Sequence, residues 1–413
     1  MPILLSVPEL RPGMRLAQPL LDATQLLLPA DKELERADIQ GLVRRVPHLS
    51  ALIVDPILDE LASFADEAGD QAVARQAQSA LIDTLIEVRG RFEQHMSLSS
   101  LDVGSLQRTI QEVIAFVNRS PVAAAMLVAN GAKGHYLTTH PANVFYLSLF
   151  IGNAVHRVVI REWTRQQRRK SGVVNEEMSI APLALGALFL DVAMWPMEHL
   201  YGKSAPLTAK ERAAIRRHPV DGANMLPDGV PDLTRLIVRT HHENIDGSGY
   251  PDGLVGDEIH LFARIVRVAD AFDAAIATPV FREAKSPVRV LWEMSLGPHR
   301  RCYDKIILKV FSQLVHPYPI GAKVRLSNGQ FGVVVRHGID DPFRPQVIIA
   351  FDGGGKRLPR NQISGVVQLD LQDELRIVSF RGEDLSYVNQ TTPDEPDATV
   401  LTQFESLFES AYP

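Results

Sequence analysis

The chain has little cysteine and no excess of positive charge, and both absences narrow the classes of protein it can belong to. Among its 413 residues there is one cysteine, Cys302, so no internal disulfide framework can form. Its 43 Lys and Arg stand against 49 Asp and Glu, which leaves a net charge of -6. Proteins that bind nucleic acid generally carry a basic balance or a basic patch. We therefore expect no disulfide-stapled domain and no general nucleic-acid partner.

A leader pattern and long hydrophobic runs are lacking as well. The N-terminus does not show the succession of basic, apolar and small residues that is typical of a signal peptide. The longest apolar runs, 146–155 and 180–194, are short or contain Asp191, so neither is expected to span a membrane. With 46% hydrophobic residues the chain can bury a sizeable core. These features predict a cytoplasmic protein.

The sequence pattern divides the first three quarters of the chain into three segments. Residues 1–56 alternate short apolar pieces with turns and predict a small α+β module. Residues 57–128 place apolar side chains at helical spacing and predict a helical connector. Its apolar stripe is interpreted as core, with the pairing of two chains in a homodimer as the alternative. Residues 129–314 predict an all-helical domain, so the fold class is mainly α.

The last quarter of the chain changes to the pattern of strands. Residues 315–385 predict a small β module, because alternating β-branched runs are joined by the Asn328-Gly329 turn. A structural lid or docking module is favoured over a ligand-binding PilZ barrel, because the paired arginines of PilZ are not present at a matching spacing. Residues 386–413 predict a partly flexible tail.

The polar chemistry of the chain concentrates in residues 240–251, Thr-His-His-Glu-Asn-Ile-Asp-Gly-Ser-Gly-Tyr-Pro. Apolar spacing upstream predicts a helix that ends at His241 and His242, and the glycines and Pro251 then predict a tight loop. Neutral imidazole is a common ligand of transition metals, and a nearby carboxylate can fix its tautomer. The stretch therefore predicts a metal site at the bend.

This stretch resembles the signature of the HD-GYP family, whose members are metal-dependent phosphodiesterases of the bacterial second messenger cyclic di-GMP, and the resemblance extends from about His140 to Arg282. It implies an HD-type helical domain that holds one or two divalent transition ions, with iron or manganese favoured. By this resemblance the metal ligands are His140, Asp191, His218, His241, His242 and Asp270. The resemblance also implies catalytic roles for Asp191 and Arg282, and a substrate loop comprising Gly247, Gly249, Tyr250 and Pro251, with Asp273 beside it.

The same resemblance reveals three departures from the family pattern. The His-Asp-x-Gly-Lys motif stands here as residues 190–194, Leu-Asp-Val-Ala-Met, so Leu190 replaces a metal-binding His and Met194 replaces a Lys expected at the scissile phosphate. Pro279 stands where the family tends to have an arginine that grips phosphate, and Tyr136 stands where some relatives place a carboxylate for a third metal. Losing a positively charged side chain that contacts the scissile phosphate typically lowers the rate about a hundred- to a thousandfold. We therefore expect a weakened metal site and impaired hydrolysis.

Two functions from different classes follow from these features. The favoured hypothesis is a signalling protein that binds cyclic di-GMP or a related cyclic dinucleotide, or docks other signalling proteins through the Gly-Tyr-Pro loop, with weak or absent hydrolysis. The alternative is an active metal-dependent cyclic di-GMP phosphodiesterase. Basic residues at 157–170 are interpreted as a solvated helix end, with anion binding as the alternative, and His48, His95, His316 and His337 lie outside the ligand pattern.

Overall fold

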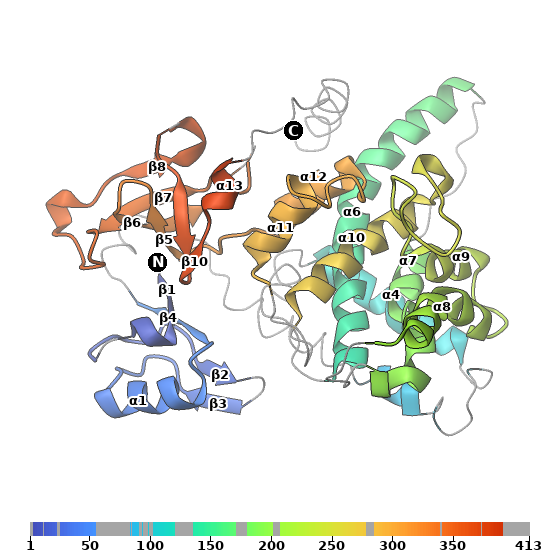
Figure 1. Cartoon of the computed structure of the whole chain (residues 1–413), viewed down its shortest axis with the longest axis horizontal. Helices are drawn as coiled ribbons and strands as arrows, with labels where there is room; N and C mark the ends of the chain where they lie inside the picture. Colours follow the sequence, from blue (N-terminus) through green and yellow to red (C-terminus); the bar gives the residue numbers. More distant parts are fainter. Residues whose placement is uncertain are drawn as a thin grey trace. The chain divides into compact units, whose positions relative to one another are not determined.

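The computed structural model describes residues 3–54, part of 83–119, 135–170, 180–200, 207–277 and 285–390, with short gaps inside the first and last of these ranges. Side chains of residues 156–170 are not described, so the predicted role of the basic run lies outside the described side chains. The elements form two compact units (Figure 1). The β unit combines 3–54 with 316–390, and the helical unit contains the helices between them.

The helical unit confirms the prediction of an all-helical domain in the middle of the chain. Its elements are α4 Val103–Arg119, α6 Tyr136–Lys170, α7 Ala181–Phe189, η2 Val192–Leu200, α8 Ala209–Met225, α9 Asp232–Thr240, η3 Gly256–Glu258, α10 Leu261–Ile276, α11 Pro287–Ser295 and α12 Lys305–Leu314. Helix α6 packs against α7 and α10, and α9 packs against α7 and α8. The four helices that carry the candidate ligands are thus neighbours in one core.

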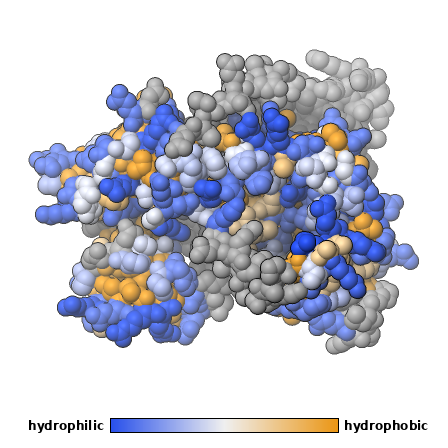
Figure 2. Space-filling view, viewed as in Figure 1, coloured by the Kyte–Doolittle hydropathy of each residue, from blue (hydrophilic) through white to orange (hydrophobic). Residues whose placement is uncertain are grey.

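Helix α7 lies at the centre of this core. Length and composition alone would let residues 181–200 cross a membrane, but 78% of the apolar window is buried inside the protein. The face of the helical unit seen in Figure 2 is mostly hydrophilic, which agrees with burial of its apolar helices. Burial of such a helix against others contributes the hydrophobic free energy that holds the unit together.

Local sequence signals begin and end the helices that carry the site. Helix α8 begins with a capping box, in which Thr208 Oγ1 accepts from the Glu211 amide at 3.2 Å and the Glu211 carboxylate accepts from the Thr208 amide at 2.7 Å. Helix α9 ends at Thr240, and His241 is its C-cap, as the sequence pattern predicts. Its buried face comprises Thr234, Ile237, Val238 and Thr240.

The β unit is built from two two-stranded sheets and one larger sheet. Its elements are β1 Ile3–Ser6, η1 Val7–Glu9, β2 Leu20–Asp22, β3 Gln25–Leu28, α1 Arg36–Arg45, β4 Ser50–Ile53, β5 Lys323–Leu326, β6 Phe331–Arg336, β7 Gln346–Phe351, η4 Arg360–Gln362, β8 Val366–Gln368, η5 Leu369–Leu371, β9 Ile377–Phe380, β10 Glu383–Asp384 and α13 Ser386–Gln390. Strands β1 and β4 pair, β2 and β3 pair, and the larger sheet has the order β10-β9-β5-β6-β7-β8. All named pairs are antiparallel.

The N-terminal module and the C-terminal β module share one hydrophobic core. The two modules meet at a parallel bridge between Leu4 and Ala322, and the Leu4 amide donates to the Gly321 carbonyl at 2.7 Å. The shared core contains Leu5, Val7, Leu16, Leu42 and Ile53 from one end of the chain and Val333, Val335, Ile348 and Ala350 from the other. The sequence pattern indicates two separate modules, and the long-range packing makes them one unit.

The remaining segments are described in part. Of the predicted connector 57–128, the structure describes α4 and some residues from 83 onward. Of the predicted tail 386–413, it describes α13, which packs against β9. The predictions of a homodimer through the connector and of a flexible tail therefore lie mainly outside the described residues.

Candidate metal centre

All six residues predicted as metal ligands come together in the interior of the helical unit. They come from five places in the chain, namely His140 on α6, Asp191 between α7 and η2, His218 on α8, His241 and His242 at the end of α9, and Asp270 on α10. Five of them are buried, and His242 is half-buried. Charged and polar side chains are seldom buried unless they are paired or hold a metal. The burial of these polar and charged side chains together must therefore be balanced by interactions among them or with a metal ion.

The two carboxylates link the imidazoles into a closed arrangement. Asp191 places Oδ1 3.3 Å from His218 Nε2 and Oδ2 3.7 Å from His140 Nε2. Asp270 places Oδ1 3.1 Å from His140 Nε2 and Oδ2 3.4 Å from His242 Nδ1. Each carboxylate thus directs its two oxygens to two different histidines. In this arrangement a carboxylate can be shared between two neighbouring metal positions.

The tautomer of His218 is set by the proline that follows it. Pro219 lies inside α8 and has no amide hydrogen, so it cannot donate to the carbonyl of Ile215 one turn earlier. His218 Nδ1 lies 2.6 Å from that carbonyl oxygen. Because a carbonyl only accepts, Nδ1 carries the proton and donates it to Ile215. Nε2 of His218 is then left as an acceptor that points into the site.

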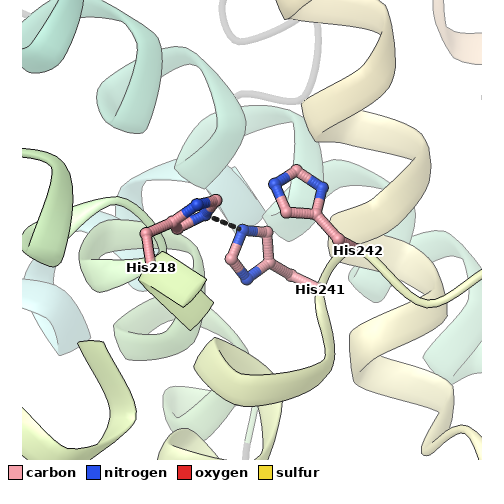
Figure 3. A group of neighbouring side chains, drawn as sticks. All are labelled: His218, His241 and His242. Atoms are coloured by element: carbon pink, nitrogen blue, oxygen red, sulfur yellow. Dashed lines mark hydrogen bonds between the residues drawn. The ribbon is translucent and has the colours of Figure 1, made fainter. Parts of the chain in front are cut away.

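His241 is held in the same way by the last turn of α9, where carbonyls lack helical partners. Its Nδ1 donates to the Val238 carbonyl at 2.7 Å, so Nε2 is again an acceptor. Figure 3 shows the two rings pointing toward each other, with the Nε2 atoms of His218 and His241 3.1 Å apart. If both rings are neutral, two acceptors at this separation repel each other unless a proton or a metal ion lies between them. The helix geometry thus creates a place that a metal ion can fill.

The orientation of His140 is fixed by Asp273, whose carboxylate is held in turn by Asn143. Its Nδ1 lies 2.6 Å from Asp273 Oδ2, and the other oxygen of Asp273 accepts from Asn143 Nδ2 at 2.9 Å. The ring of Tyr136 stacks on the His140 ring at 4.8 Å with an interplanar angle of 8°. A carboxylate behind an imidazole fixes its orientation and raises its basicity as a ligand. His140 Nε2 therefore faces Asp191 and Asp270.

The electrostatics of the site separate the imidazoles into two groups. Burial, reinforced by His218, lowers the pKa of His241 to about 3, and burial together with His241 holds the pKa of His242 well below its usual range. Burial also opposes the charged form of His140, but hydrogen bonds to Asp270 and Asp273 raise its pKa well above the ordinary value. Neutral His241 and His242 are the form that binds metals.

The two carboxylates are also unequal. Burial raises the pKa of Asp191, against the opposing effect of His218 and His140. Burial acts in the same direction on Asp270, but its hydrogen bond with His140 and the nearby His242 hold its pKa well below the usual value. Asp270 is thus the carboxylate whose charge the site stabilises most strongly in the absence of a metal.

The loop after α9 is anchored by Glu243. This carboxylate is buried and accepts from the amides of Asp252, Gly253 and Leu254 at 2.6, 3.1 and 3.1 Å. Gly249 packs directly on the backbone of the preceding turn, so that an added Cβ would overlap Glu243 and Asn244. The Glu243 carboxylate therefore anchors the loop and does not serve as a candidate metal ligand.

The predicted substrate loop, residues 247–251, lies against the histidines. Gly247 has a φ of 79°, a left-handed conformation that favours glycine. The ring of Tyr250 lies 4.7 Å from that of His242, and its amide donates to the His242 carbonyl at 3.2 Å. Pro251 follows within the same loop. The loop thus covers the His242 side of the site. Asp273, which the resemblance groups with this loop, lies instead on α10 and contacts His140.

The positions that depart from the family pattern are placed in part. Leu190 and Met194 are both buried on either side of Asp191, and the Met194 amide donates to the Asp191 carbonyl at 2.8 Å. Pro279 and Arg282 lie outside the described residues. Leu190 and Met194 therefore contribute apolar packing at this turn, and neither side chain offers a nitrogen to the site.

Sequence reasoning missed several residues that support the site. Arg267 donates to Asn244 at 2.9 Å and lies 3.6 Å from Asp270, and Asn143 holds Asp273. A signal for both exists in the sequence, because Asn143 and Arg267 lie three residues from His140 and Asp270 and so share a helix face with them. Arg216 was also missed, and its guanidinium lies 4.4 Å from the Tyr250 ring centre.

The donor set fits a divalent transition ion. One nitrogen of each of His218, His241 and His242 lies within 4.8 Å of the others, and two carboxylates adjoin them. Nitrogen and carboxylate oxygen donors suit zinc, iron, manganese or cobalt. The opposed Nε2 atoms of His218 and His241 are the observation that most directly favours a metal ion here.

Two family models match the chain. The model described as an HD domain matches residues 148–306, which begin just after His140. The model described as a KOW domain associated with an HD domain matches residues 323–380 and so covers most of the larger sheet of the β unit. The sequence pattern predicts that sheet as a small β module, and the match identifies its kind.

Several curated relatives are similar to the chain. Cyclic di-GMP phosphodiesterase PA4108 of Pseudomonas aeruginosa is 28% identical over 68% of this chain and 63% of its own length. The cyclic di-GMP phosphodiesterase response regulator RpfG of Xanthomonas campestris is 46% identical over 20% of this chain and 22% of its own length. The 3'3'-cGAMP-specific phosphodiesterase 3 of Vibrio cholerae is 54% identical over 37% of this chain and 30% of its own length.

The chain therefore spans less than two thirds of the length of these relatives. Five of the six converging ligand candidates lie inside the matched range, and His140 lies eight residues before it. The chain therefore contains an HD domain over residues 148–306, and it is similar to relatives named as cyclic di-GMP phosphodiesterases.

Proposed function

We propose that the chain is a metal-binding cyclic dinucleotide signalling protein whose hydrolytic activity is weak or absent. The observation that carries the metal is the pair of opposed Nε2 atoms on His218 and His241, surrounded by the other four candidate ligands. The cyclic dinucleotide is proposed because relatives similar to the chain are named phosphodiesterases of cyclic di-GMP or 3'3'-cGAMP. The complete Gly-Ser-Gly-Tyr-Pro loop beside His242 supports the same ligand.

The protein's own residues would divide the work as follows. His140, Asp191, His218, His241, His242 and Asp270 would hold one or two divalent ions, which when bound supply Lewis-acid polarisation of a phosphoryl oxygen and activation of water. Asp191 offers one oxygen to the His218 side and one to the His140 side, which suits a shared ligand. Asp273 keeps the proton of His140 on Nδ1, and Glu243 keeps the loop closed over His242.

Weak or absent hydrolysis is proposed because two groups of the family motif are missing at one turn. Leu190 gives no nitrogen to a metal, and Met194 gives no cation to the charge that grows on the phosphoryl oxygens. Both side chains are buried and apolar, so water cannot readily substitute for the lost groups there. A protein with this site would bind the nucleotide, or dock partners through its loop, more effectively than it turns the nucleotide over.

The test combines three measurements on the full-length protein. Elemental analysis after purification without chelator should find a transition metal, calorimetry should find binding of cyclic di-GMP, and a turnover assay in manganese or iron should find little product. Absence of metal under conditions that load an intact relative would remove the site from the proposal. The assays should be repeated with 3'3'-cGAMP, which the Vibrio cholerae relative is named for.

An active phosphodiesterase is the second candidate function. It is favoured by the six remaining donors, which still link Asp191 and Asp270 to three different helices. Fast turnover by the wild-type protein would select it. The cytoplasmic location and the homodimer remain predictions that follow from sequence alone.

A further inference from the structure

Arg216 occupies an unusual position beside the candidate metal centre. It lies on α8, two residues before His218, and its side chain is exposed. Its guanidinium carbon is 4.4 Å from the centre of the Tyr250 ring, whose other close ring neighbour is His242 at 4.7 Å. The contact brings a permanent positive charge to the loop that covers the site, although Arg216 and Tyr250 are 34 residues apart in sequence.

Neighbouring arginines are already committed to carboxylates. Arg239 forms two hydrogen bonds to Asp252, at 3.0 and 2.7 Å, and Arg267 lies 3.6 Å from Asp270 and donates to Asn244. Arg217, the next residue to Arg216, pairs with Asp221 at 3.1 Å. Within the described part of the chain, Arg216 has no carboxylate partner. Its charge is therefore available to a ligand.

The position of Arg216 over the Tyr250 ring suits recognition of a phosphate. A guanidinium on an aromatic face is held by the attraction between cation and ring, while its N–H groups remain in its own plane and can pair with two oxygens at once. The ring that holds Arg216 belongs to the same loop that contacts His242. A phosphate that enters beside the metal ligands would therefore meet this fork of donors at the rim of the site.

We propose that Arg216 binds a phosphate of the cyclic dinucleotide. From its exposed position beside Tyr250, it supplies a positive charge that the buried Met194 does not supply. This inference rests on the proposed function and specifies how its ligand is gripped. The role is in binding, because a cation at the rim contacts the bound nucleotide before and after any chemical step. It accounts for nucleotide recognition by a site whose lysine position is apolar.

The experiment compares two adjacent arginines that have equal charge and different contacts. Calorimetry with cyclic di-GMP is performed on the full-length, manganese-loaded wild type, on Arg216→Ala and on the matched control Arg217→Ala. Because a charge-assisted pair to phosphate is lost, Arg216→Ala should raise the Kd by about tenfold or more. Arg217→Ala should change the Kd by roughly twofold or less, since an exposed ion pair contributes little. Arg216→Lys should fall between, because it keeps the charge and loses the fork.

Metal content and melting temperature are measured on the same samples. Both should be equal in the wild type and Arg216→Ala, because the side chain is exposed and contacts no ligand candidate directly. If the wild type binds the nucleotide and the two alanine variants bind it equally well, the inference about Arg216 is wrong and the proposed function stands. If the metal-loaded wild type binds no cyclic dinucleotide, the proposed function fails and the inference fails with it.

Discussion

The two sides of the candidate metal centre differ in how much of their chemistry is present. On the α8 and α9 side, His218, His241 and His242 lie together, and backbone carbonyls fix the tautomers of the first two. On the α7 side, Asp191 is the single polar group of its turn, between the buried apolar side chains of Leu190 and Met194. One side offers three imidazoles to a cation, and the other offers one carboxylate among apolar side chains.

This difference teaches that ligand geometry and catalytic groups can separate within one site. The histidine side depends on helix ends, Pro219 and the loop anchor Glu243, which also maintain the fold. Leu190 and Met194 are apolar and buried, so they pack as core residues beside Asp191. Because core packing and catalysis make separate demands on a residue, fold and function need separate tests.

Removing a histidine from the organised side should have the largest effect. We expect His241→Ala to lower the metal content and to lower the melting temperature of the metal-loaded protein, because a metal present at about a hundred times its Kd stabilises the native state by roughly 3 kcal/mol. After chelation, the melting temperature of the variant should differ from that of the wild type only because the smaller alanine leaves a cavity in the core. His260→Ala, which removes a helix cap away from the site, is the control and should shift both states equally. Equal shifts for His241→Ala would make His241 merely structural.

Restoring the depleted side should have the next largest effect. The double change Leu190→His with Met194→Lys should raise the rate of cyclic di-GMP hydrolysis by about a hundredfold or more, since a cation at the phosphoryl oxygens stabilises the transition state. Each single change should gain less, and the two effects should be non-additive because they act on one transition state. Turnover is measured at saturating manganese or iron. A wild type that is already as fast as the double variant would show that the two sides do not differ in function.

The support behind His140 can be weakened without touching a ligand candidate. Both oxygens of Asp273 accept hydrogen bonds, from His140 and Asn143, whereas an asparagine has one acceptor oxygen. We expect Asp273→Asn to weaken metal affinity by about ten- to a hundredfold, measured by competition with a chelator. Asp257→Asn, at an exposed position paired with Arg264, is the control. An unchanged affinity in Asp273→Asn would mean that His140 does not need this support.

The smallest effect should come from the start of α8. Thr208→Ala removes the hydroxyl of the capping box and should destabilise the protein by about 1 kcal/mol, measured by denaturant unfolding of the metal-free form. Thr208→Ser keeps the hydroxyl and should be close to the wild type. A loss in the serine variant as large as in the alanine variant would show that the methyl group of Thr208, rather than its cap, stabilises the helix.

Much of the fold was predictable because its signals are local. The capping box at Thr208 and Glu211, the end of α9 at His241 and the turn at Asn328 and Gly329 each act within a few residues. The joining of the two ends of the chain was not predictable, because Leu4 and Ala322 are brought together by a core that no local pattern specifies. Similarly, the resemblance grouped Asp273 with the substrate residues, and only the packing of α10 against α6 shows that its carboxylate contacts His140.

The sequence by itself determined which residues carry the chemistry and where their helices end, since residue type, helix caps and proline act through the nearest turns of backbone. It also determined the absence of a histidine at Leu190 and of a lysine at Met194. Only the tertiary structure decided which carboxylate oxygen faces which imidazole, that Asp273 supports His140 across 133 residues of chain, and that Arg216 lies on Tyr250. These contacts depend on how α6, α8 and α10 pack, and packing is a property of the whole core rather than of any segment.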